Sequence, residues 1–93
     1  MKGFVKLFEL STKQQVLFRL EYDHSRQVYA IECSTFVRAT FYREMQVYDT
    51  YDEMKFDFEY RMNQDNAENF YRHAHNEVEI LEDESMGLDA LLN

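Results

Sequence analysis

The chain has 93 residues, a formal net charge of −8, no proline, two glycines and one cysteine. This length predicts a single domain, and seven tyrosines and eight phenylalanines supply enough apolar surface to exclude a wholly disordered chain. A lone cysteine excludes an intramolecular disulfide, and no apolar N-terminal run is long enough for a signal peptide or a membrane span, so we expect a cytoplasmic protein without membrane contact.

Three apolar stretches in the first half of the chain predict strands. Residues 4–10 are apolar with weak alternation, and residues 16–22 and 27–33 alternate around the turn sequence 23–26. The last two stretches are typical of a hairpin. At strand spacing, Cys33 is expected to be a small buried hydrophobic residue and not a reactive thiol. The inward positions expected for the hairpin are Val16, Phe18, Leu20, Tyr22, Tyr29, Ile31 and Cys33.

Residues 34–48 are compatible with two structures. Their threonine, valine, phenylalanine and tyrosine content favours a strand. Yet Val37, Phe41, Met45 and Tyr48 also fall at helical spacing, and Ser34 could cap such a helix. We favour the strand.

Residues 54–62, MKFDFEYRM, alternate without a fault between apolar and charged side chains. This pattern predicts a strand after a turn at 49–53, with Phe56, Phe58 and Tyr60 on the covered face. Asp57 and Glu59 would then share the solvent-exposed face, about 6.7 Å apart from twice the strand rise. That distance is similar to the spacing of neighbouring phosphates along a nucleic-acid strand.

The period changes at residues 63–76 and predicts a helix of about three turns. Its apolar positions follow i, i+3, i+4 and i+7, Asp65 is a good N-cap, and Glu68 completes a capping box. Val78 and Leu81 would extend this stripe, but Asn76 could end the helix and residues 77–81 alternate, so we favour a short strand there. The apolar stripe of the expected helix is Ala67, Phe70, Tyr71 and Ala74.

The architecture that follows is α+β, with a mostly antiparallel sheet of four to six strands and one main helix, about residues 64–76, packed on one face. Residues 1–83 are expected to form this single domain. Residues 84–93 form an acidic and leucine-rich tail, which could fray, cover the domain's own core, or dock on a partner as a helical turn.

The sequence contains no motif for catalysis, a cofactor or a metal. On a helix, His73 and His75 would point about 200° apart and could not share one ion. Phosphate-binding loops and nucleophile motifs do not occur, and the plentiful carboxylates do not single out an acid–base pair. Bases could stack on the aromatic rings of residues 36–43, which are interleaved with arginines, but the acidic remainder of the chain opposes direct nucleic-acid binding. We therefore expect a non-enzymatic protein without a cofactor.

Charge is distributed unevenly along the chain. Residues 1–43 hold seven Lys/Arg and four Asp/Glu, net +3, whereas residues 44–93 hold three Lys/Arg and fourteen Asp/Glu, net −11. The acidic half should attract a protein with a basic surface, such as a nucleic-acid-binding enzyme. The candidate partner-binding residues are Glu44, Asp49, Asp52, Glu53, Asp57, Glu59, Glu77, Glu79, Glu82, Asp83 and Glu84.

In its size, lack of proline, aromatic content and acidic residues 44–89, the chain resembles the small phage-encoded DNA-mimic proteins that inhibit restriction and other defence systems. The resemblance is one of character and rests on no motif. It implies an inhibitor, acting in the host cytoplasm, that presents a DNA-like carboxylate surface to a basic nucleic-acid-binding site. The basic first half departs from this pattern and leaves an alternative open, a structural or assembly protein that acts as a homodimer or as a small subunit of a larger complex.

Overall fold

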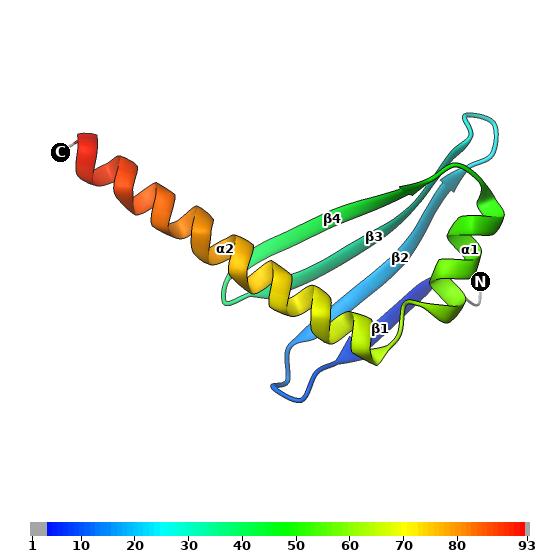
Figure 1. Ribbon diagram of the computed structural model, residues 1–93, viewed down its shortest axis with the longest axis horizontal. Coiled ribbons are helices and arrows are strands. Elements are labelled where there is room, and N and C mark those ends of the chain that lie inside the picture. The colour runs from blue at the N-terminus through cyan, green and yellow to red at the C-terminus, as the bar shows by residue number, and fades with distance from the viewer. Residues whose placement is uncertain (1–3, 93) are drawn as a thin grey trace.

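The structure is a computed structural model that describes the backbone of residues 4–92 and the side chains of residues 4–83. Four strands form an antiparallel sheet in the order β1-β2-β3-β4, and two helices lie across one of its faces (Figure 1). The predicted α+β class is confirmed, although two helices are present where one was expected. Neither helix, over the residues described, is long and apolar enough to cross a membrane. The elements are β1 (Val5–Glu9), β2 (Gln15–Asp23), β3 (Val28–Val37), β4 (Thr40–Tyr48), α1 (Tyr51–Tyr60) and α2 (Gln64–Leu92).

The hairpin expected in the first half is present as β2 and β3. Phe18 lies opposite Cys33 and Leu20 lies opposite Ile31, so the predicted inward residues share one face. The ambiguous residues 34–48 are strand and not helix, because β3 extends to Val37 and a two-residue turn leads into β4. Residues with positive φ in the three hairpin turns are Lys13 (71°), Gln27 (55°) and Arg38 (56°).

The core lies between the sheet and the two helices. Phe18 and Ile31 from the sheet meet Met54 and Phe58 from α1, all of them buried. Cys33 is also buried there, as predicted, and this burial, with smaller contributions from Glu44 and Glu32, raises the pKa of its thiol to about 12. The thiol therefore stays protonated at neutral pH and acts as a packing group.

The strand predicted for residues 54–62 is wrong, because these residues form most of α1 and the turn after it. Met54, Phe58 and Met62 are four residues apart, and this helical spacing buries all three against the sheet. Phe56 and Tyr60, which a strand would have turned inward, are 52% and 66% exposed and pack on each other. Residues 54–62 therefore fit both the two-residue alternation of a strand and the four-residue spacing of a helix. The more obvious alternation concealed the helical spacing.

Both ends of α1 have a hydrogen-bonding partner. The Thr50 hydroxyl accepts a hydrogen bond from the backbone N–H of Glu53, which places an N-cap before the acidic first turn. At the other end, Lys6 of β1 donates from Nζ to the carbonyl oxygens of Phe58 (2.5 Å), Glu59 (3.2 Å) and Met62 (3.2 Å). The last turn of α1 contains no basic residue, so a cation from a distant strand stabilises its C-terminus.

The second helix begins near the predicted place but continues further. The Asn63 side chain accepts a hydrogen bond from the N–H of Asn66 (2.9 Å), so Asn63 and not Asp65 caps α2. The predicted apolar stripe does face the sheet, with Ala67 and Ala74 fully buried. Two alanines at these positions let the helix backbone approach the strands closely.

The short strand predicted for residues 77–81 is wrong, because α2 extends through this segment. Val78 continues the stripe four residues after Ala74 and is buried against Val37 at the end of β3. Helical backbone continues to Leu92, well beyond the edge of the sheet (Figure 1). The side chains of residues 84–93 lie outside the described residues, so the docking of the C-terminal leucines stays a prediction.

Candidate protein-binding surfaces

The face of the sheet that points away from both helices, called the open face below, is rich in exposed apolar side chains. Antiparallel sheets with one uncovered face normally place polar residues there. Here Phe41 is 53% exposed and Val47 is 76% exposed, and five further large hydrophobic residues on the same face are exposed as well. The exposed hydrophobic residues of the open face are Val5, Leu7, Val28, Phe36, Phe41, Met45 and Val47.

The strand register makes neighbours of several of these side chains. Phe36 lies opposite Phe41, with ring centroids 5.2 Å apart, and Leu7 lies opposite Leu17. These four side chains line one shallow hollow together with Ser34. These four apolar side chains therefore form a connected patch and are not single exposed residues, and connected apolar patches mark contact sites.

A small group of charged side chains lies in the middle of the open face. Arg19 on β2 donates from Nη2 to Glu32 Oε2 on β3 (2.5 Å) and also contacts Glu21. The Glu32 side chain is only 7% exposed, and its hydrogen bond is the main reason that the pKa of Arg19 is raised. The buried carboxylate therefore already has its counter-ion within the same chain.

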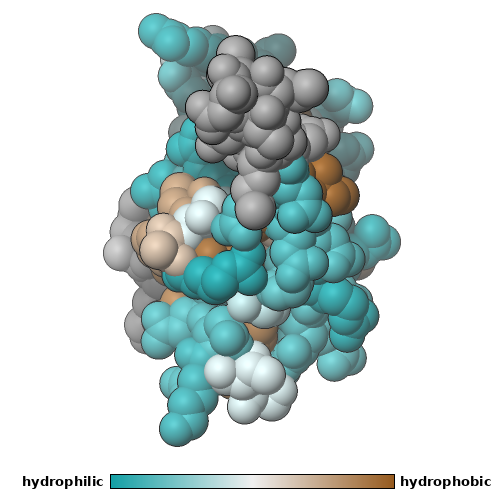
Figure 2. Space-filling model, turned by 90° about the vertical axis from the view of Figure 1, so that its left-hand side faces the viewer, coloured by the Kyte–Doolittle hydropathy of each residue, from teal (hydrophilic) through white to brown (hydrophobic). Residues whose placement is uncertain are grey.

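The candidate acidic residues do not form one surface. One cluster lies at the start of α1, and a second lies along α2, at opposite ends of the molecule (Figure 1). Figure 2 looks onto the end from which α2 projects, where hydrophilic residues dominate and hydrophobic residues form separate small areas. The first cluster contains Asp49, Asp52, Glu53 and Asp57, and the second contains Glu77, Glu79, Glu82 and Asp83.

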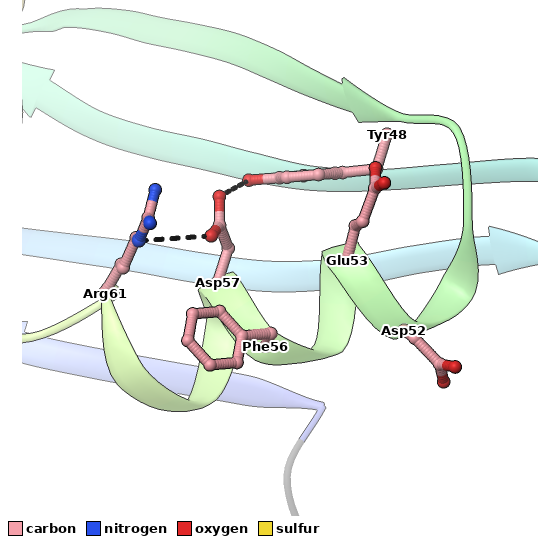
Figure 3. A pocket seen from close by; sticks show the side chains of 6 residues that line it. All are labelled: Tyr48, Asp52, Glu53, Phe56, Asp57 and Arg61. Atoms are coloured by element: carbon pink, nitrogen blue, oxygen red, sulfur yellow. Dashed lines mark hydrogen bonds and ion pairs between the residues drawn. The ribbon is translucent and has the colours of Figure 1, made fainter.

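The first acidic cluster borders a hollow between the end of β4 and α1 (Figure 3). Asp57 lies in it and is held from two sides, by the hydroxyl of Tyr48 (2.8 Å) and by Nε of Arg61 (3.5 Å). Burial, followed by the hydrogen bond to Asp57, raises the pKa of Tyr48 well above its usual range. Asp57 therefore has a structural role, whereas Asp52 and Glu53 remain exposed to solvent.

The predicted phosphate-like spacing of Asp57 and Glu59 is wrong, since it required a strand. Two residues apart on a helix, their side chains point about 200° apart. Asp57 faces β4, while Glu59 lies on the outside of α1 beside Lys55 (3.4 Å). These two carboxylates cannot form a regular row.

Glu44 belongs to a third group, at the contact between β4 and α2. Its Oε1 accepts a hydrogen bond from the hydroxyl of Tyr42 (2.5 Å) and also lies 2.9 Å from Nε2 of His73. The Tyr42 hydrogen bond, followed by the interaction with His73, lowers the pKa of Glu44. His75 lies beside Glu79 instead (3.5 Å), so the two histidines have different partners.

The second acidic cluster lies on the part of α2 that leaves the sheet, residues 79–92, called the arm below. Glu82 pairs with Arg38 of the β3–β4 turn (2.7 Å), and Asp83 is exposed. Ile80 and Leu81 are also exposed, so the arm is not only a charged surface. Glu77 is half-buried just before the arm, and the side chain of Glu84 lies outside the described residues.

The open face was not predicted from the sequence, although the strands carry a signal for it. Residues 4–10 alternate only weakly, because apolar side chains occupy both faces of β1. The same holds for β4, where Phe41, Met45 and Val47 point away from the helices. When apolar residues occupy both the odd and the even positions of a strand in a two-layer protein, they indicate a second apolar face.

No protein-family model matches the chain, and comparison with curated proteins and with solved structures finds no significant match. The case for a function therefore depends on these surfaces.

Proposed function

We propose that this chain is a non-enzymatic protein-binding module and that the open face is its contact surface. The observation that carries the proposal is the connected patch of exposed apolar side chains on the uncovered side of the sheet. Leaving such a patch in water costs about 25 cal/mol for each Å² of apolar area, which a protein partner would recover by covering it. The aromatic pair Phe36 and Phe41 provides the large, rigid side chains that are enriched at protein contacts.

The hydrogen bonding of the carboxylates supports a binding role over a catalytic one. Asp57 and Glu44 each line a hollow, and each accepts a hydrogen bond from a tyrosine hydroxyl. An acid–base catalyst needs a free position from which to reach its substrate. Asp57 instead links α1 to β4, and Glu44 links β4 to α2 through His73.

Site-specific photo-crosslinking tests the proposal in cells that produce the full chain. A benzophenone amino acid replaces Phe41 on the open face, and a matched control replaces Phe56, which is equally exposed on α1. We expect a discrete protein adduct from position 41 and much less from position 56. The absence of any protein adduct at position 41, with the control variant folded, would contradict the proposal.

The acidic surfaces support a second candidate, an inhibitor that binds the basic nucleic-acid site of another protein. Residues 44–93 carry net −11, and no lysine or arginine occurs after Arg72. Such a surface would steer a basic partner at long range, and binding would weaken steeply with salt. With Asp57 and Glu59 held in separate surroundings, the carboxylates in question are Asp52 and Glu53 at α1 and those of the arm.

Competition on DNA-cellulose tests this second function. Host proteins bound to the column are eluted with the purified chain at low and high salt. We expect Glu79→Gln with Asp83→Asn to reduce elution of a specific protein, whereas Asp65→Asn with Glu68→Gln, an equal change of charge elsewhere on α2, should not. Equal effects of the two double variants would show that only total charge matters.

A further inference from the structure

We infer that the open face binds a second copy of this chain, packed sheet against sheet in a two-fold dimer. The inference rests on the proposed function, which requires only that some protein covers this face. It commits to one occupant, and the distribution of charge in the molecule identifies that occupant.

The negative charge of the chain is concentrated in the helices. The four strands hold three Lys/Arg and five Asp/Glu, net −2, whereas the two helices hold two Lys/Arg and twelve Asp/Glu, net −10. Pairing through the helices would bring two strongly acidic surfaces together, which is unfavourable at short range. Pairing through the open faces places both acidic layers on the outside of the dimer, with the apolar surfaces between them.

The charged group on the open face suits this arrangement. Arg19 lies on β2 and its partner Glu32 lies directly opposite on β3, the two central strands. A two-fold axis that runs along the strands between β2 and β3 places β2 of one copy over β3 of the other. Each Arg19 then faces the partner copy's Glu32, and a second copy of the chain supplies this reciprocal match by symmetry.

If a partner covered the open face, Arg19 and Glu32 would still be paired with each other. Glu32 is already largely shielded from water and hydrogen-bonded to Arg19 within its own chain. Covering the face would therefore desolvate mainly Arg19, which is 46% exposed and keeps Glu32 as its counter-ion. Around it, the exposed Val5, Met45 and Val47 supply apolar surface for the aligned packing of two sheets.

Sedimentation equilibrium of the purified full-length chain tests the dimer. We expect a monomer–dimer equilibrium, with Phe41→Lys raising the dissociation constant at least tenfold and Val47→Lys acting in the same direction. The matched control is Phe56→Lys, which adds the same charge at an equally exposed phenylalanine on α1 and should leave the constant unchanged. Circular dichroism of each variant confirms that it is folded.

Each alternative outcome is distinct. A chain that stays monomeric at all concentrations, while the crosslinker at position 41 still captures another protein, overturns the dimer and leaves the proposed function standing. A monomer without any adduct at position 41 overturns both. A dimer that Ile80→Lys dissociates and Phe41→Lys does not would overturn face-to-face packing, since the arm would then be the contact.

Discussion

The two faces of the sheet both carry large hydrophobic residues but have opposite surroundings. On the covered face, Phe18 and Ile31 are almost completely buried beneath α1 and α2, whereas Phe36 and Phe41 on the open face are more than half exposed. Large hydrophobic residues occur on both faces, so their presence alone does not explain this contrast. The helices decide it, because both of them pack on the same side. Apolar side chains therefore occur on both faces, and among the described residues the helices cover only one of the two.

The largest effect that this comparison predicts separates Phe18 from Phe41. Phe18→Ala should lower the free energy of unfolding by about 3–5 kcal/mol, since it opens a cavity in the core. Phe41→Ala should change it by about 0.5 kcal/mol or less when measured by urea unfolding at low protein concentration. Equal losses at low concentration would mean that the isolated chain itself covers the open face.

A second prediction compares neighbouring residues on α1. Phe58→Ala should cost about 3–5 kcal/mol of unfolding free energy, because Phe58 is 1% exposed. Phe56→Ala should cost little, since only contacts with Tyr60 and Arg61 are lost. A strand over residues 54–62 would bury both rings, so similar costs for the two variants would restore the strand and remove α1 from the covered face.

The charged group of the open face provides a prediction of intermediate size. Arg19→Met should destabilise the chain by about 1–3 kcal/mol, because it leaves the shielded Glu32 without its donor. Replacing Glu32 with Met as well should recover much of this loss, since no shielded carboxylate then remains without its donor. Thermal and urea unfolding of the single and double variants measure the difference. If the double variant were no more stable than Arg19→Met, Glu32 would have another role in the sheet.

The smallest predicted effect depends on pH and concerns the edge of the covered face. The pKa of Tyr48 is higher in the folded chain than its ordinary value of about 10. Its contribution to stability is therefore fully present below about pH 10 and is lost as the pH rises further, because only the unfolded chain then deprotonates readily. Unfolding free energies at pH 9 and pH 11 should fall less for Tyr48→Phe than for the parent. Tyr60→Phe, at an exposed position, is the control and should follow the parent.

The sequence by itself determined the parts of the fold in which one period stands alone. Residues 16–33 alternate cleanly, so the β2–β3 hairpin, its inward side chains and the burial of Cys33 could be predicted. The spacing from Ala67 to Ala74 has only a helical interpretation, and this part of α2 was predicted as well. In both cases the local pattern and the tertiary packing require the same structure.

Only the tertiary structure decided the rest. Residues 54–62 satisfy both periods, and the helix is selected by the space over the sheet and by Lys6, a residue more than fifty positions away whose ammonium group stabilises the end of α1. That choice moved Asp57 and Glu59 apart and removed the expected row of carboxylates. It also placed both helices on one face and left the other uncovered. The open face could not be predicted from any one strand, because exposure depends on which side the helices occupy.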